Sequence, residues 1–298
     1  MKPENEAHLQ TMTQAVEEAL SKCVVVTPET APQSLVIDAM RYSLEAGGKR
    51  IRPVLVLEFC RVCGGRTEEA MSAACAVEMI HTFSLIHDDL PEMDNDDYRR
   101  GKLACHKVYG PDVALQAGDA LAVGALEAIL SDPVLTPERA RALALELSHA
   151  TGAAGMVGGQ ILDMSYEKRS ESVTLQELEQ MIQAKTGALI RASCKMGCIA
   201  AGADDQKVAL AAEYGEKLGF AFQIVDDILD VTSTTEQLGK TAGSDLKEGK
   251  ATFVSIMGLD AARERAAQLT AEALMILQEF TDCGFLSDLT QDLLLREK

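Results

Sequence analysis

The chain has 298 residues and carries 28 Lys and Arg side chains against 46 Asp and Glu side chains, a formal net charge of −18. So large an excess of acid argues against a nucleic-acid partner, because nucleic-acid binding relies on Lys and Arg to neutralise phosphates. A hydrophobic content of 47% is too high for a disordered chain, and no stretch approaches the ~18–20 uninterrupted apolar residues of a membrane span.

Helical patterning runs from one end of the chain to the other. Residues that favour helices are frequent, and apolar residues recur at three- and four-residue spacing with little strict alternation. The pattern predicts helices over 34–46, 50–63, 67–88, 112–131, 136–152, 174–202, 206–232 and 258–279, separated by breaks that carry Gly, Pro, Asp or Ser. Because no linker, repeat or low-complexity tract interrupts them, we expect one all-α domain over residues 1–298.

The cysteines and the N-terminal segment indicate the cellular compartment in which the protein is expected. The first ten residues are polar and acidic, which argues against a signal peptide. Eight cysteines are scattered through apolar helical segments, and the one C-x-x-C, Cys60 to Cys63, has no second pair or His cluster to complete a zinc site. We therefore expect buried, reduced thiols and a cytoplasmic protein without a membrane span.

Cations stand beside glycines at several places. The turn G-G-K-R-I-R-P at 47–53 leads into a predicted helix, where backbone N–H groups also favour a phosphate. Arg99 and Arg100 follow an acidic run, and Arg can grip phosphate with two parallel hydrogen bonds. Lys185 lies mid-helix in K-T-G, and two Gly-Lys pairs at 239–240 and 249–250 suit a lid over bound phosphates. Each alone could be a surface charge, but together they predict a site for diphosphate esters.

A predicted buried helix leads directly into an acidic run. Residues 71–86 are apolar nearly all round, which is typical of a buried helix. The motif D-D-x-x-x-x-D at 88–94 follows, and six acids lie between residues 88 and 97. A divalent cation with oxygen ligands would relieve their repulsion, and Mg²⁺ is the usual ion where phosphates supply the other ligands. The alternative is a solvated acidic loop.

A second apolar helix, 218–229, ends in D-D-x-x-D at 226–230. Asp226 and Asp230 share a helix face and have no compensating Lys in that turn, so their repulsion also favours a bound cation over a surface turn. Two such clusters, each ending an apolar helix, predict a pocket in which they face each other across several Mg²⁺ ions. The apolar helices would form either a cavity for a hydrocarbon tail or ordinary core.

These motifs, in this order, resemble the trans-prenyl diphosphate synthases, most closely the short-chain bacterial farnesyl diphosphate synthases. The resemblance spans roughly residues 40–260 and includes H-T-F-S-L-I-H-D-D-L-P, G-G-Q-I-L-D-M and K-T-G-A-L-I-R-A. It implies the isoprenoid-synthase fold, an antiparallel helix bundle around a deep central cavity, and a homodimer. It also implies Mg²⁺-dependent head-to-tail condensation of isopentenyl diphosphate with dimethylallyl and geranyl diphosphates, giving farnesyl diphosphate (C15) and diphosphate.

The resemblance implies a role for each matching residue. The ligands of three Mg²⁺ ions, for which Mn²⁺ is a possible substitute, would be Asp88, Asp89, Asp94, Asp226, Asp230 and Asp245. Isopentenyl diphosphate would be held by Lys49, Arg52, His81 and Arg100. The allylic diphosphate would be held by Arg99, Lys185, Lys240 and Lys250. Thr186 and Gln223 would turn oxygens toward the developing cation, and with Arg99 and Lys185 they form the expected catalytic set.

The length of the product depends on the floor of the cavity. Phe83 lies five residues before Asp88 and Ser84 lies four before it. In the family, bulky residues at this point stop elongation, so Phe83 indicates a C15 product. Five residues turn a helix through roughly 500°, however, so Phe83 is not directly under Asp88, whereas the small Ser84 is.

Other functions stay open at this point. The same chemistry could give geranylgeranyl diphosphate (C20). A terpene cyclase on the same fold would need no second diphosphate site, which G-G-K-R-I-R-P, His81 and Arg100 oppose. A non-catalytic synthase subunit would typically lack one Asp motif, and both are intact. His81 could also be an ordinary core histidine.

Overall fold

The computed structural model describes residues 1–167, 169, 172–232 and 250–294. Its first half consists of α1 (Pro3–Cys23), η1 (Ala31–Gln33), α2 (Ser34–Leu44), α3 (Ile51–Val62), α4 (Thr67–Asp88), β1 (Tyr98–Arg99), β2 (Lys102–Leu103), α5 (Cys105–Tyr109), α6 (Pro111–Leu130) and α7 (Pro137–Thr151). Its second half consists of α8 (Met156–Glu167), α9 (Leu175–Ile182), η2 (Gln183–Gly187), α10 (Ala188–Ala201), α11 (Asp205–Thr232), α14 (Phe253–Met257), α15 (Leu259–Leu277) and α16 (Gly284–Leu294). The all-α prediction is confirmed.

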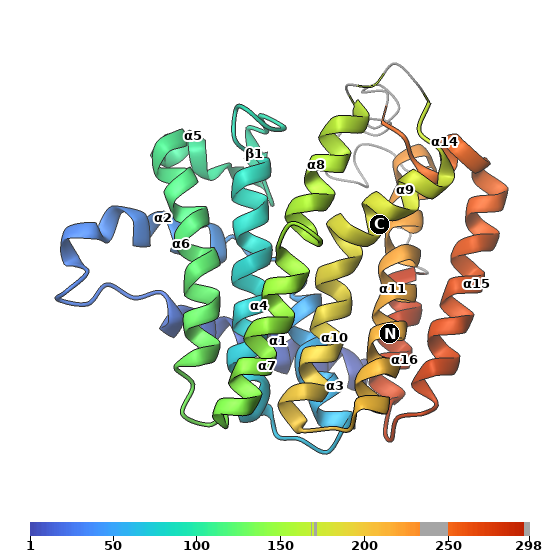
Figure 1. The fold of residues 1–298 in the computed structure, drawn as a ribbon, viewed down its shortest axis with the longest axis horizontal. Coiled ribbons are helices and arrows are strands. Elements are labelled where there is room, and N and C mark those ends of the chain that lie inside the picture. The colour runs from blue at the N-terminus through green and yellow to red at the C-terminus, as the bar shows by residue number, and fades with distance from the viewer. Residues whose placement is uncertain (168, 170–171, 233–249, 295–298) are drawn as a thin grey trace.

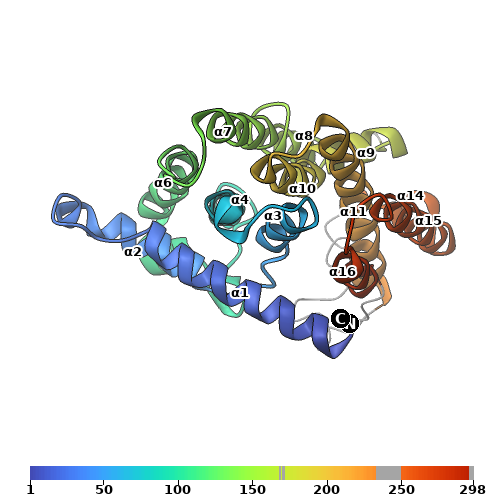
Figure 2. The ribbon, with the colours of Figure 1, turned by 90° about the horizontal axis from the view of Figure 1, so that it is seen from below.

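Most of the long helices run side by side as a bundle (Figure 1). Seen from below, α3 and α4 lie inside a ring that includes α6, α7, α10 and α11, while α1 lies across the bundle and α15 lies outside α11 (Figure 2). Helices α3 and α4 are buried along most of their length, as the apolar pattern of residues 71–86 predicts for α4. The two short strands pair antiparallel, Tyr98 with Leu103 and Arg99 with Lys102, in a small ribbon that follows the acidic run.

The predicted helices correspond to observed ones with small differences at their ends. The prediction for 67–88 coincides with α4, and those for 112–131 and 206–232 agree with α6 and α11 to within one residue. The predicted helix 174–202 is divided into α9, a π-helical turn η2 and α10. All eight cysteines are free thiols, and Cys63 contacts Cys198 with the sulfur atoms 3.5 Å apart.

Some helices were not predicted. In α1 the buried residues Met12, Val16 and Leu20 follow each other at four-residue spacing, a pattern that a longer window would detect. The segment that forms α8 contains or directly follows four glycines between 152 and 159, and glycine disfavours helix by about 1 kcal/mol. Close packing outweighs this cost, because a Cβ at Gly159 would lie 2.2 Å from the backbone nitrogen of Lys185.

Helix α6 is, within the part of the chain that the structure describes, the one helix long and apolar enough to cross a membrane by length and composition. It packs along α4 in the bundle, and one face is buried there. The buried residues of that face are Ala114, Ala117, Gly118, Leu121, Ala125 and Ile129. This burial accounts for the apolar character of that face.

Candidate active site

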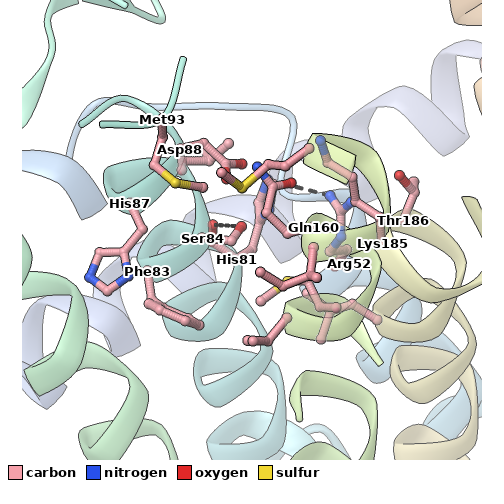
Figure 3. Close-up of a pocket in the computed structure, with 16 residues that line it drawn as sticks. Arg52, His81, Phe83, Ser84, His87, Asp88, Met93, Gln160, Lys185 and Thr186 are labelled. Carbon is pink, nitrogen blue, oxygen red and sulfur yellow. Dashed lines mark hydrogen bonds between the residues drawn. The ribbon is translucent and has the colours of Figure 1, made fainter. Parts of the chain in front are cut away.

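A cavity of about 410 Å³ opens between α4, α8 and the η2–α10 segment. Figure 3 shows Asp88 near the end of α4, with His81, Ser84 and Phe83 lower on the same helix. Its polar lining consists of Arg52, His81, Ser84, His87, Asp88, Gln160, Lys185 and Thr186. Its apolar lining consists of Phe83, Leu85, Met93, Met156, Val157, Ile161, Met164 and Leu189. One space thus has a charged end and extensive apolar walls.

The first Asp motif places one carboxylate into this cavity. Asp88 is the last residue of α4, and its carbonyl accepts a hydrogen bond from the Asp94 backbone at 2.9 Å, which closes the turn. Burial raises the pKa of Asp88 to about 6; Asp94 and Asp89 act in the same direction, while Lys185 and Arg99 oppose it. A divalent cation would favour the charged form of this buried carboxylate, and exposed Asp94 lies on the same turn.

The neighbouring Asp89 has another partner. Its side chain is buried, and Arg99 donates to Oδ1 from Nε at 2.9 Å and also from Nη2. Burial raises the pKa of Asp89, and Arg99 opposes that effect. The expected roles of Asp89 in metal binding and of Arg99 in substrate binding remain predictions, but here the two side chains bind each other beside the cavity.

The residues expected to hold isopentenyl diphosphate gather near the start of α3. Arg52 Nη1 lies 3.4 Å from His81 Nε2. Arg100 donates to the carbonyl of Gly47, and a Cβ at Gly48 would lie only 2.8 Å from the guanidinium carbon of Arg100. Exposed Lys49 is on the same turn. Four residues from three separate segments therefore lie around one turn, and their role in holding isopentenyl diphosphate, which the resemblance implies, remains a prediction.

His81 is not isolated in an apolar core. Burial lowers the pKa of His81 well below its ordinary value, and Arg52, Arg100, Arg50 and Arg99 add to this effect. The imidazole is therefore neutral near pH 7. A neutral imidazole can donate a hydrogen bond to a bound anion without adding charge, whereas the arginines supply the positive charge.

Lys185 and Thr186 lie on the π-helical turn η2 and line the cavity. Such turns are often found at functional sites because the extra residue changes the direction of the side chains. Lys185 Nζ pairs with the carboxylate of Asp163 on α8. Neither Asp163 nor Gln160, which lines the cavity one turn earlier on α8, was assigned a role from the sequence. The signal available was the pair of polar residues within G-G-Q-I-L-D-M.

The second Asp motif lies near the C-terminal end of α11. Asp227 is buried and fixes the local structure: it accepts from Gln223 Nε2 at 2.9 Å and from the backbone nitrogen of Phe253 at 2.8 Å, which ties α11 to α14. Asp226 acts electrostatically on Arg52: burial lowers the pKa of Arg52, whereas Glu78 and Asp226 raise it. Gln223 thus contacts Asp227 here, and its expected catalytic role remains a prediction.

The carboxylates of the two motifs do not form a ready-made cage. Within the described ranges, no group of three or more His, Cys, Asp and Glu side chains is arranged to hold a metal ion. Carboxylates from both motifs, Asp88 with Asp94 and Asp226 with Asp230, could each contribute one or two oxygens, as Mg²⁺ sites do when phosphates complete the coordination. Lys250 pairs with Glu167 at 3.4 Å, whereas Lys240 and Asp245 lie outside the described residues.

The residues expected to limit product length lie on the cavity wall. The ring of Phe83 meets that of His87 edge-on, with centroids 4.8 Å apart. His87 Nε2 in turn lies 3.1 Å from the carbonyl of Leu115 on α6. Ser84 lines the cavity and donates to the carbonyl of His81 at 2.9 Å. Phe83 is thus held in place by a side chain that is itself fixed to a neighbouring helix.

Comparison with known proteins identifies the class. Residues 33–286 match the polyprenyl synthetase family. A dimethylallyltranstransferase of Fischerella ambigua is 49% identical over 245 residues, 82% of this chain and 70% of that protein. A geranylgeranyl diphosphate synthase of Cyanophora paradoxa is 46% identical over 259 residues, 87% of this chain and 85% of that protein. The chain belongs to the polyprenyl synthetase family.

Solved structures agree with this assignment. An FPP/GFPP synthase from Zymomonas mobilis superposes with a TM-score of 0.88 at 32% identity and covers 98% of this chain and 99% of its own. A geranylgeranyl pyrophosphate synthetase from Pyrococcus horikoshii superposes with a TM-score of 0.90 at 30% identity and covers 99% of both chains. The isoprenoid-synthase fold expected from the motifs is confirmed.

Proposed function

We propose that this chain condenses isopentenyl diphosphate head-to-tail with an allylic diphosphate. The observation that carries the proposal is the cavity itself, in which Asp88 and Lys185 lie at the charged end of an apolar space, beside the basic group Arg52, His81 and Arg100. Asp88 and Lys185 would serve the diphosphate of one substrate, and Arg52, His81 and Arg100 would serve that of the other. An enzyme with a single substrate, such as a cyclase, would not need a second diphosphate site.

The chemistry follows from the two halves of the site. The C1–O bond of the allylic diphosphate breaks, and its electron pair leaves with the diphosphate. The double bond of isopentenyl diphosphate forms the new bond to C1, and the proton released afterwards passes to the diphosphate. Lys185 would neutralise charge on the departing oxygens, and the apolar walls would exclude water that would otherwise quench the cation.

Mg²⁺ would be held by Asp88, Asp94, Asp226 and Asp230, and when bound it supplies Lewis-acid stabilisation of the leaving diphosphate. The protein's own contribution is to hold these carboxylates at the C-terminal ends of α4 and α11, with Asp94 in the turn that follows α4. The turn that closes after α4 places Asp94 near Asp88. The hydrogen bond from Phe253 to Asp227 fixes the end of α11 on which Asp226 lies.

For the product we propose farnesyl diphosphate (C15), because the bulky ring of Phe83, held edge-on against His87, lines the cavity on the helix that ends at Asp88. Geranylgeranyl diphosphate (C20) is the second candidate. It is favoured by the names of relatives such as the Cyanophora paradoxa protein. Both products come from the same reaction and differ only in how many times it is repeated.

The requirement for two substrates tests the proposed reaction. Diphosphate release from geranyl diphosphate should be slow in Mg²⁺ alone, should accelerate when isopentenyl diphosphate is added, and should stop in EDTA. Rapid release without isopentenyl diphosphate would contradict the proposal and indicate a cyclase or a hydrolase.

A further inference from the structure

Glu78 is a buried carboxylate for which the reaction described above gives no role. It lies on α4 one turn before His81 and is 1% exposed. A buried carboxylate is costly unless it is paired, so its partners indicate why it is there. Among the residues that the structure describes, its ion-pair partners are Arg50, directly before α3, and Arg100.

Arg50 is the nearest of them. Its Nη1 donates to Glu78 Oε1 at 2.5 Å, and its Nη2 donates to the carbonyl of Leu44 at 2.5 Å. Arg50 is itself 4% exposed and has a left-handed backbone, with φ of 50°, directly before α3. The Glu78–Arg50 pair therefore joins the end of α2, the start of α3 and the middle of α4, and so fixes both ends of the 45–50 turn.

Arg100 is held from the other side. Its Nη2 lies 3.9 Å from the same Oε1 of Glu78, while its Nη1 donates to the carbonyl of Gly47. The backbone of Arg100 is also left-handed, with φ of 52°, and a side chain at Gly48 would collide with its guanidinium. One carboxylate oxygen thus lies between two arginines from separate segments and brings both to the same turn.

The charge balance supports a role in organising this group. Arg50, Arg52 and Arg100 repel one another: Arg100 lowers the pKa of Arg52, after the larger effect of burial, and Glu78 opposes this. Burial likewise lowers the pKa of Arg100, and Glu78 is the first group that raises it. Glu17 on α1 also pairs with Arg50, with Oε1 3.5 Å from Nε, so two carboxylates lie against three guanidinium groups. One net positive charge stays in place to receive an anion.

We infer that Glu78 is a positioning residue for the isopentenyl diphosphate half of the site. Its carboxylate, held by Arg50, keeps Arg100 and the Gly47-Gly48-Lys49 turn in the geometry that binds the diphosphate group. This inference rests on the proposed function, because it assigns the basic group to isopentenyl diphosphate. Glu78 would not contact substrate, and it would act only through Arg100 and the turn.

The test uses the full chain and measures binding by calorimetry as well as turnover. Glu78→Gln keeps the shape of the side chain and removes its charge. We expect it to weaken isopentenyl diphosphate binding at least ~10-fold and to raise its KM similarly, because Arg100 loses its fixed partner. The Kd for geranyl diphosphate should change less than about 3-fold, and Glu78→Asp should recover part of the loss.

The matched control is Glu58→Gln. Glu58 is also 1% exposed, lies on the adjacent α3, and pairs with Arg61 and His8 away from the cavity. It should lower thermal stability comparably and leave isopentenyl diphosphate binding unchanged. In an Arg100→Ala background, Glu78→Gln should have little further effect on that binding, because the two residues act as a unit.

Several results would overturn the inference. Glu78→Gln could weaken the binding of both substrates equally, or its effect on isopentenyl diphosphate binding could add to that of Arg100→Ala. It could also give the same binding and stability changes as Glu58→Gln, or bind isopentenyl diphosphate more tightly, which would mean that Glu78 acts only by reducing the local positive charge.

Failure of the proposed function is a separate result. In that case the wild-type chain binds isopentenyl diphosphate but forms no product, and the effect of Glu78→Gln on binding can still be measured. A wild type that does not bind it overturns both.

Discussion

Two adjacent aspartates at the end of α4 have different partners. Asp88 lies on the cavity wall, where burial raises its pKa to about 6, whereas the carboxylate of Asp89 is paired with Arg99. The sequence motif treats the two alike. The difference arises because the chain turns back after α4, which brings Arg99 into contact with Asp89. The spacing of acidic residues in the sequence does not predict that turn.

The first prediction at this scale concerns Asp88. Asp88→Asn should lower kcat by at least ~10²-fold, because it removes a metal-binding oxygen at the leaving group, and the thermal midpoint should not fall. The comparison variant is Asp97→Asn, in the same acidic run but paired with Lys107 at 2.7 Å. Steady-state kinetics at saturating Mg²⁺ measure both. Near-normal turnover in Asp88→Asn would show that this carboxylate is not a metal ligand.

The second residue-scale prediction concerns product length. Phe83→Ala should remove the ring that narrows the cavity and shift the main product toward C20 or longer. Ser84→Ala, one residue further on the same wall, changes little volume and should leave the product unchanged. Chromatographic sizing of the products distinguishes these outcomes. If Phe83→Ala made the same product as the wild type, another part of the cavity would set the length.

At the scale of elements, prediction succeeded where local pattern and tertiary environment agree. The bounds of α4 followed from an Ala-rich apolar stretch that begins with acids and ends before Pro91. Helix α8 was missed because its glycines disfavour helix locally and are needed for close packing, which depends on the partner segment. Gln160 and Asp163 were missed with it, and so was the π-helical turn that carries Lys185.

The contact between α8 and η2 provides a prediction for this scale. A Cβ at Gly159 would lie 2.2 Å from the backbone nitrogen of Lys185 and 2.5 Å from its Cα, so Gly159→Ala must displace the turn. We expect a loss of about 1–3 kcal/mol in the free energy of unfolding, as for other overpacked sites, and reduced kcat. At Gly124 a Cβ would meet only the flexible end of Met79, at 3.0 Å, so Gly124→Ala should be neutral or stabilising. Equal stability in the two variants would contradict the assignment.

At the scale of the whole molecule, the outer face of α6 exposes large apolar side chains among polar ones such as Asp119 and Glu127. Leu115, Val123 and Leu130 are 42%, 70% and 59% exposed. We propose, in line with the sequence expectation of a homodimer, that a second copy covers this face. Light scattering should give the mass of a dimer for the wild type and of a monomer for Val123→Glu. A wild-type monomer at micromolar concentration would contradict this.

Part of the net charge of −18 can be assigned to the two Asp motifs. Residues 88–97 hold six acids and residues 226–230 hold three, so nine of the 46 acidic residues lie in the two motifs. The composition predicts that nucleic acid is not the partner. In the proposed function a polyanion would still bind, through cations at these motifs and through the arginines near Glu78.

The proposed joining of isopentenyl units to an allylic diphosphate can be measured by incubating the chain with dimethylallyl and isopentenyl diphosphates in Mg²⁺ and identifying the products by mass spectrometry. We expect farnesyl diphosphate as the main product, one released diphosphate for each bond formed, and no product when either substrate or Mg²⁺ is withheld. Finding no product longer than the five-carbon substrates would contradict it.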